Sequence, residues 1–226
     1  EAKELFKSLD AELAIVVAYG KILPDELLHT PKYGCINMHA SLLPKLRGAA
    51  PIQWAVITGE KRTGVTSMQM DAGIDTGDML LSKSVDIGEN ETAEELHDRL
   101  SVLGAEVMRE TISALQAGEL CPVKQDDKKS THAPILTKEL SKIDWNDTAQ
   151  HIHDKIRGLY SWPGATCEFK GKVIKIHSSR LAGECGGKPG EVSESDKRLV
   201  VCCGDGNAVE ILVLQAVSYT HLTLPT

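Results

Sequence analysis

Two polar side chains stand at the end of a short apolar segment, Asn37 and His39. Side chains two residues apart in a strand point to the same side, so this pair faces one direction. In open α/β sheets, ligands bind outside the carboxyl ends of the strands, which is where the pair falls. An amide donor beside an imidazole suits a reaction in which negative charge develops on an oxygen atom. The plainer interpretation is a pair that bonds only to nearby backbone.

The loop 71–78 is a second candidate, because it carries Asp71, Asp75 and Asp78 beside two glycines. Its carboxylates resemble those of a calcium loop, but no glutamate follows at the spacing of an EF-hand. A surface turn without function is another interpretation. We favour a third, in which one aspartate approaches His39, because a nearby carboxylate favours the protonated imidazole and fixes its orientation.

The elements that must position these residues alternate between strands and helices. We expect strands over 13–18, 34–38, 63–70 and 79–87, and helices over 24–28, 49–57 and 92–117. The continuous apolar run 13–18 predicts a strand buried on both faces, as in a parallel sheet. The longest helix carries leucine and valine on one face and ends before Gly118. This alternation predicts an α/β first domain over residues 1–119.

The character of the chain changes after residue 119. Residues 120–138 are polar, and we interpret them as a linker. Residues 139–217 begin with a short helix and continue as strand-like segments separated by turns, which predicts a small β-barrel. Residues 218–226 follow the last predicted strand without a closing element, and we expect them to be a non-native tail.

Composition narrows the class of protein. The 226 residues carry a net charge of −7, which argues against nucleic-acid binding over the whole surface but allows a local basic patch. No apolar run approaches the ~20 residues of a membrane-spanning helix. The six cysteines contain no C-x-x-C pair, so we expect reduced and mostly buried thiols rather than a zinc site.

The motif at Asn37 belongs to a longer pattern. Residues 37–44 read N-M-H-A-S-L-L-P, residues 47–52 read R-G-A-A-P-I, and residues 71–78 fit D-x-G-x-D-T-G-D. Together with A-Y-G at 18–20, I-D-W at 143–145 and W-P at 162–163, these segments resemble the methionyl-tRNA formyltransferases over most of residues 11–217. The N-x-H pair and the aspartate are shared by folate-dependent formyltransferases in general. The 47–52 segment and the second domain favour the tRNA enzymes.

The resemblance implies a Rossmann-like formyltransferase domain without its first strands, followed by an OB-like C-terminal domain. Since the family extends beyond both ends of this chain, we expect an exposed edge on the 13–18 strand. The resemblance assigns catalytic roles, without a metal, to Asn37, His39 and Asp75. It assigns the binding of 10-formyltetrahydrofolate to Ser41, Leu42, Leu43 and Pro44, with Tyr19 beside the pterin.

The implied reaction transfers a formyl group from 10-formyltetrahydrofolate to the α-amine of methionyl initiator tRNA, for translation initiation. Seven basic and four acidic groups give residues 141–180 a charge of +3, which suits a local phosphate contact. The basic groups are Lys142, Lys155, Arg157, Lys170, Lys172, Lys175 and Arg180. We expect a monomer without a membrane partner, in the cytoplasm or in an organelle matrix.

Three other functions fit the same residues. The site could formylate a different amine, on a ribonucleotide or an amino sugar, or could hydrolyse the folate and release formate. The chain could also be a fragment that binds tRNA without catalysis. The nature of the second domain favours the tRNA enzyme over the other acceptors.

Overall fold

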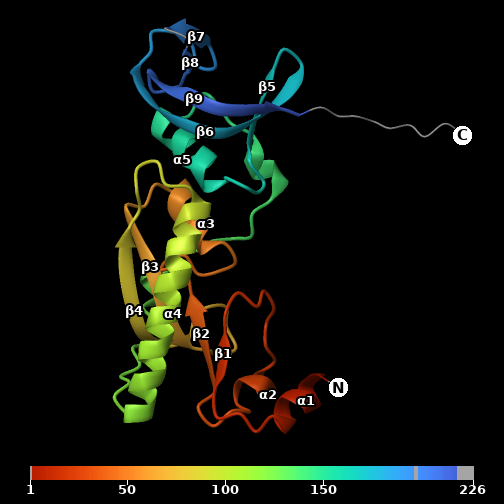
Figure 1. The fold of residues 1–226 in the computed structure, drawn as a ribbon, viewed down its shortest axis with the longest axis vertical. Helices are drawn as coiled ribbons and strands as arrows, with labels where there is room; N and C mark the ends of the chain where they lie inside the picture. Colours follow the sequence, from red (N-terminus) through yellow and green to blue (C-terminus); the bar gives the residue numbers. More distant parts are fainter. Residues whose placement is uncertain (1, 196–197, 218–226) are drawn as a thin grey trace, which may run out of the picture. The chain divides into compact units, whose positions relative to one another are not determined.

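The computed structural model describes residues 2–195 and 198–217, and the chain divides into two compact units (Figure 1). The first unit comprises residues 1–55, 60–88 and 95–135. The second comprises residues 56–59, 89–94 and the chain from Leu136 onward. The predicted tail at 218–226 lies outside the described residues.

The first unit is built on a four-stranded mixed sheet in the order β1-β2-β3-β4. Strand β1 is parallel to β2, whereas β2, β3 and β4 are successively antiparallel. The strands are β1 (Ala14–Val16), β2 (Cys35–His39), β3 (Arg62–Gln69) and β4 (Met79–Asp86). The short helices are α1 (Ala2–Ser8), α2 (Asp25–Leu28) and α3 (Pro51–Ile57).

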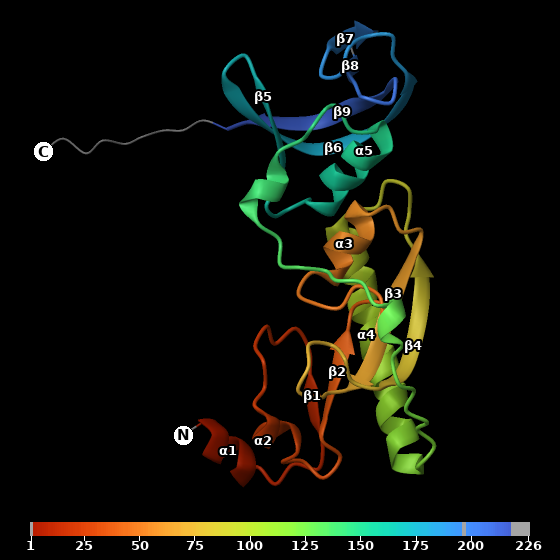
Figure 2. The same ribbon diagram turned by 180° about the vertical axis from the view of Figure 1, so that it is seen from behind.

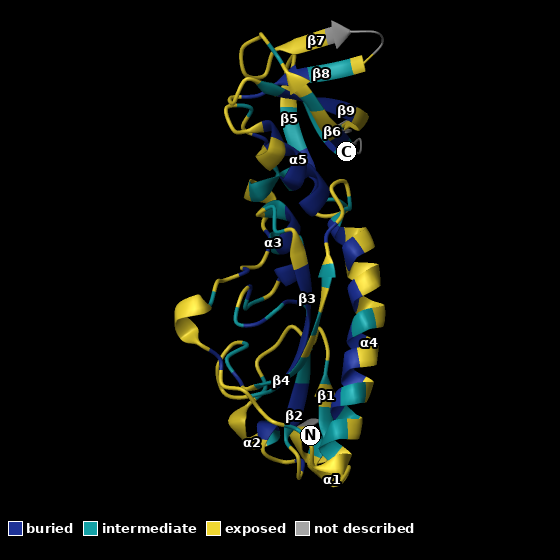
Figure 3. Cartoon of the chain, turned by 90° about the vertical axis from the view of Figure 1, so that its left-hand side faces the viewer, coloured by how far each residue is buried: buried dark blue, intermediate teal, exposed yellow. Residues whose placement is uncertain are grey.

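The long helix α4 (Ala93–Ala117) covers one face of this sheet. Figure 3 shows one stripe of buried residues along the helix and an exposed opposite side, as the apolar spacing predicted. Its Thr111 hydroxyl lies 2.7 Å from the Ser67 hydroxyl of β3. Gly118, with φ of 70°, follows its last residue. No helix in the described part of the chain is long and apolar enough to cross a membrane.

Strand β1 corrects one expectation and bears out another. It spans only three residues and lies at the edge of the sheet, with β2 as its neighbour. Ile15 is 48% exposed and Val17 is 61% exposed. The prediction of a strand buried on both faces is therefore wrong, and the expected exposed edge is present.

The polar segment interpreted as a linker is instead held against the first unit for most of its length. Val123 exchanges two backbone hydrogen bonds with Met79, at 2.8 and 2.9 Å. Farther along, Arg47 donates from its backbone to the Thr131 carbonyl (2.9 Å), and Ala133 donates back to the Arg47 carbonyl (2.7 Å). We call residues 122–134 the strap; Figure 2 shows this green segment returning past α3. The strap is polar because it forms hydrogen bonds to the segments at Met79 and Arg47, and not because it is a free linker.

The second unit is an antiparallel five-stranded sheet in the order β5-β6-β9-β8-β7, with helix α5 packed against β6. Its core is apolar and includes Ile152 and Ile156 of α5 together with Ile176 and Val209 of the sheet. The sheet is formed by β5 (Ala165–Phe169), β6 (Lys172–Glu184), β7 (Val192–Ser195), β8 (Arg198–Cys202) and β9 (Asn207–Ala216). Helical residues precede it in the turn η2 (Lys138–Ser141) and in α5 (Ala149–Gly158).

The cysteines do not all remain reduced as expected. Cys185 and Cys202 form a disulfide with Cα atoms 5.6 Å apart. Cys185 follows β6 and Cys202 ends β8, so the folding of the sheet brings together residues 17 positions apart. Their spacing in the sequence carries no sign of this pairing. The remaining four cysteines are free.

A buried histidine makes the stability of the second unit depend on pH. His153 is 3% exposed; its Nε2 lies 3.1 Å from the Glu89 carbonyl oxygen, and its Nδ1 lies 3.0 Å from the Ser179 hydroxyl. Burial lowers the pKa of His153 below the usual value of ~6.5. As the pH falls through the unfolded value, the unfolded chain binds a proton that the folded chain does not, so stability falls.

We expect the unfolding free energy of the chain to drop between pH 7.5 and 5.5 more steeply than that of His153→Gln, by at most ~1.4 kcal/mol per pH unit. Denaturant unfolding at several pH values measures both slopes. Glutamine retains a donor for the Glu89 carbonyl but cannot take up a proton. Identical slopes in the two proteins would contradict the assignment.

Candidate functional site

The carboxyl end of β2 presents Asn37 and His39 on one face. Met38 lies between them and points the other way, toward α4, where a Cβ added to Gly104 would lie 3.3 Å from Met38 Cγ. Asn37 and His39 therefore face away from α4, because side chains alternate along a strand. His39 is buried and Asn37 is partly buried. The alternation argument from the sequence describes this end of the strand correctly.

The loop between β3 and β4 supplies Asp75. Asp71 Oδ1 accepts from the backbone of Gly73 (3.0 Å) and from the Thr76 hydroxyl (2.7 Å), which ties the loop to itself. A Cβ added to Gly77 would lie 1.7 Å from the Gln69 carbonyl oxygen, so only glycine permits this close approach. Asp75 has φ of 53°, a left-handed conformation that aspartate adopts more readily than most residues.

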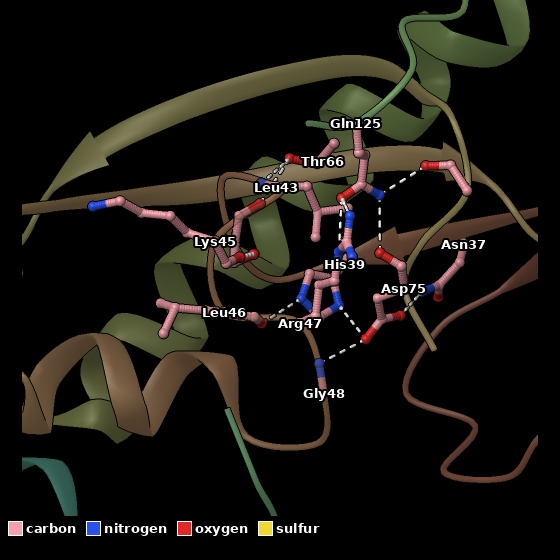
Figure 4. A network of polar contacts seen from close by, with 12 residues as sticks. Asn37, His39, Leu43, Lys45, Leu46, Arg47, Gly48, Thr66, Asp75 and Gln125 are labelled. Carbon is pink, nitrogen blue, oxygen red and sulfur yellow. Dashed lines mark hydrogen bonds and ion pairs between the residues drawn. The ribbon is translucent and has the colours of Figure 1, made fainter. Parts of the chain in front are cut away.

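The carboxylate of Asp75 is the point at which these segments meet (Figure 4). Its Oδ2 accepts a hydrogen bond from the backbone N–H of Gly48 (2.8 Å) and lies 3.6 Å from His39 Nδ1. Its Oδ1 lies 3.5 Å from Asn37 Nδ2. The Asp75 side chain is 15% exposed. The structure thus brings together all three residues that the resemblance names as catalytic, around one largely buried charge.

The hydrogen bonding of His39 fixes which ring nitrogen can act. Nε2 lies 2.9 Å from the Leu46 carbonyl oxygen, which can only accept, so Nε2 carries a hydrogen. Nδ1 is the other ring nitrogen, and it faces Asp75 Oδ2 without a hydrogen bond to it.

The segment predicted to bind the folate, Ser41–Pro44, forms the turn that follows β2. The Ser41 hydroxyl is buried and donates to the Lys45 carbonyl (2.7 Å), while the Ser41 carbonyl accepts from the Thr66 hydroxyl (2.7 Å). Leu43 is buried as well, and Leu42 and Pro44 are partly exposed. Tyr19 lies in the loop after β1 with its side chain 55% exposed, outside the hydrogen-bonded cluster.

Three groups that contribute to the site were not predicted from the sequence. The Gly48 N–H holds the carboxylate, and Gln125 donates from Nε2 to the Asp75 carbonyl (2.9 Å). Arg47 donates in turn to Gln125. A backbone N–H has no sequence signal, and a glutamine in a polar stretch looks like a surface residue. Only the position of Arg47 and Gly48 in the R-G-A-A-P-I segment pointed toward them.

Metal ligands and a reactive thiol near the site would indicate other chemistry. No group of three histidine, cysteine, aspartate or glutamate side chains within residues 2–195 and 198–217 could hold a metal ion. Cys35, two residues before Asn37, is fully buried and lies 3.6 Å from the Leu27 carbonyl. Burial raises the pKa of the Cys35 thiol, which disfavours the thiolate that a nucleophile needs.

Two family models match this chain. The formyl transferase model covers residues 1–112, and the model of the formyl transferase C-terminal domain covers residues 135–223. They confirm the predicted fold class, a Rossmann-like formyltransferase domain followed by a small barrel-like domain. The curled antiparallel sheet of the second unit is that C-terminal domain.

Solved structures share the fold at low sequence identity. An N-formyltransferase from Helicobacter canadensis, solved with folinic acid and dTDP-3-aminofucose, is 23% identical with a TM-score of 0.71; the match covers 87% of this chain and 71% of that chain. HypX from Aquifex aeolicus with tetrahydrofolic acid is 22% identical with a TM-score of 0.72, covering 95% and 38% of the two chains.

Curated relatives are much closer in sequence. Methionyl-tRNA formyltransferase of Caldanaerobacter subterraneus subsp. tengcongensis is 53% identical over 92% of this chain and 68% of its own length. The Geobacter metallireducens protein of the same name is 51% identical over 89% of this chain and 65% of its own length. The chain thus spans about two thirds of the length of these relatives. Sequence identity of this order over most of the chain confirms the resemblance: the chain belongs to the methionyl-tRNA formyltransferase family.

Proposed function

We propose that this site transfers the formyl group of 10-formyltetrahydrofolate to the α-amine of methionyl initiator tRNA. The observation that carries the proposal is the meeting of Asn37, His39 and Asp75 at one largely buried carboxylate. Amide and imidazole donors beside a carboxylate provide what transfer of an acyl group to an amine requires: stabilisation of negative oxygen and removal of a proton.

The reaction joins the amine nitrogen to the formyl carbon and breaks the bond between that carbon and N10 of the folate. Negative charge develops on the formyl oxygen. Asn37 donates to it from Nδ2, and protonated His39 donates from Nδ1, the ring nitrogen that is not bonded to the Leu46 carbonyl. Asp75 accepts the proton that the amine loses, through a water molecule, and the proton passes to N10 as the bond breaks. These roles require all three side chains to reach the same formyl group. The contacts around Asp75, which bring the side chains together, support such an arrangement.

The co-substrate lies against the turn 41–44 in this proposal. Leu42 and Pro44 are the partly exposed members of that turn and supply apolar contact, while the buried Ser41 and Leu43 shape it. Tyr19 is exposed enough to contact the pterin ring. The folate supplies the activated formyl group. The folate compounds in the Helicobacter canadensis and Aquifex aeolicus structures support this choice of donor.

The basic surface that meets tRNA is smaller than the sequence count suggests. Arg157 is buried in an ion pair with Asp154, and Arg180 pairs with Glu210. The Lys155 ammonium donates to the Lys142 carbonyl, and burial lowers its pKa. We therefore assign the phosphate contact to the exposed tip of the β5–β6 hairpin, which includes Phe169, Lys170 and Lys172. The Lys170 ammonium lies 5.2 Å from the Phe169 ring centroid.

The curated relatives support tRNA as the acceptor, because relatives with about 50% sequence identity to this chain are named methionyl-tRNA formyltransferase. The amino-sugar enzyme is related at the level of fold. We place the reaction in the cytoplasm, with one chain as the working unit, since one chain supplies Asn37, His39, Gly48 and Asp75.

We expect His39→Ala to lower kcat by about 10²–10³-fold, because it removes a charged donor at the developing oxyanion. The KM for the folate should stay within about two-fold, since the role of the side chain belongs to the transition state. The measurement is formyl transfer from labelled 10-formyltetrahydrofolate to methionyl initiator tRNA, with an amino-sugar nucleotide as a competing acceptor.

His97→Ala serves as the matched control, because His97 is an exposed histidine on α4 whose contact is with Asp98. Near-normal turnover by His39→Ala would contradict the assignment of the site. Formyl transfer to the amino sugar but not to tRNA would contradict the acceptor, and formate release without any acceptor would indicate hydrolysis.

A second prediction concerns the hairpin. We expect Lys170→Ala with Lys172→Ala to weaken tRNA binding and to reduce the slope of log K against log salt by about 2, roughly one for each phosphate that is no longer neutralised. Filter binding across a series of salt concentrations measures the slope. Lys61→Ala, an exposed lysine of the first unit, is the control. An unchanged slope in the double variant would contradict the assignment.

A further inference from the structure

The strap contains one buried amide that the proposed chemistry does not use. Gln125 is 6% exposed although its neighbours in the sequence are polar. Its Nε2 donates to the carbonyls of Asp75 (2.9 Å) and Gly77 (2.7 Å), and its Oε1 accepts from Arg47 Nε (3.0 Å) and Nη2 (2.8 Å). Both hydrogens and both lone pairs of the amide are therefore engaged.

The donor side of Gln125 holds the loop that carries the catalytic carboxylate. The two carbonyls that it binds belong to Asp75 itself and to the buried Gly77 two residues later. These bonds fix the peptide groups that follow the left-handed Asp75, and so oppose rotation of the loop about that residue. The direction of the Asp75 side chain depends on this backbone.

The acceptor side of Gln125 holds the other wall of the site. Arg47 is 11% exposed at its side chain, and its Nη2 also pairs with Asp127 of the strap (2.9 Å). The residue after Arg47 is Gly48, whose N–H donates to Asp75 Oδ2. Gln125 thus bridges the segment that carries the carboxylate and the segment that donates to it (Figure 4).

We propose that Gln125 is a positioning residue for the transfer reaction, which keeps the Asp75 carboxylate against Gly48 and His39 by bonding to both segments at once. The inference rests on the proposed function, because it concerns the alignment of its catalytic aspartate. Gln125 touches no reacting atom; it acts through the backbone of Asp75 and through Arg47.

The test is Gln125→Glu, which keeps an oxygen for Arg47 and replaces the donating NH₂ by an oxygen that faces two carbonyls. We expect kcat to fall by about ten-fold or more with the KM for the folate within about two-fold, since displacement of a catalytic group acts on the chemical step. The backbone amide of Gly48 should exchange with deuterium at least about ten-fold faster, because its carboxylate acceptor has moved.

Gln116→Glu is the matched control, since Gln116 is an exposed glutamine on α4. Gln125→Met is the second variant, for the case in which a buried charge prevents folding; it keeps the length of the side chain and adds no charge. Unfolding temperatures measured beside the exchange rates confirm that each variant is folded.

Unchanged Gly48 exchange in a folded Gln125 variant would overturn the inference, whatever happens to turnover. A rise in KM alone would overturn it as well, because that result indicates weaker binding rather than poorer alignment. If the unaltered chain transfers no formyl group, the proposed function fails, and the Gly48 exchange rate in the same variants still decides whether Gln125 holds Asp75.

Discussion

The largely buried carboxylate of Asp75 requires hydrogen-bond donors, and the fold of the first unit supplies them. Burying an unpaired charge costs several kcal/mol or more, so the segments around Asp75 are held to a narrow geometry. The end of β2 supplies Asn37 and His39, and the turn before α3 supplies the Gly48 N–H. Each segment is distant in sequence from the loop that carries the aspartate, so the site exists only when the sheet has formed.

The same constraint explains why polar residues lie in unexpected places. The strap resembles a linker in composition, yet it bonds to backbone N–H and carbonyl groups at Arg47 and to the carbonyls of Asp75 and Gly77, all of which lie outside the strands. The second unit uses polar residues in a similar way: Asp154 and Arg157 form a buried ion pair in α5, and the His153 ring accepts and donates between β6 and the chain at Glu89. Charges counted as surface charges in the sequence are therefore partly internal, whereas Lys170 and Lys172 of the β5–β6 hairpin are exposed.

The sequence predicted those parts of the molecule that depend on local pattern. Periodicity located α4 and its end at Gly118, and the alternation along β2 indicated that Asn37 and His39 share a face. The arrangement that depends on distant contacts was not predictable from pattern: the edge position of β1, the pairing of Cys185 with Cys202, and the role of Gln125. The sequence does not distinguish a buried glutamine from an exposed one. Only the folded structure shows which carbonyl groups Gln125 contacts.

The most direct test of this account compares formyl transfer by the chain with transfer by Asp75→Asn. The substitution keeps the shape of the side chain and removes its charge, so it separates the carboxylate from the packing of the loop. The account predicts a fall in kcat of about 100-fold or more, with the KM for the folate within about two-fold and the unfolding temperature close to that of the unaltered chain. Turnover by Asp75→Asn near that of the unaltered chain would show that the carboxylate at which these segments meet is not part of the chemistry.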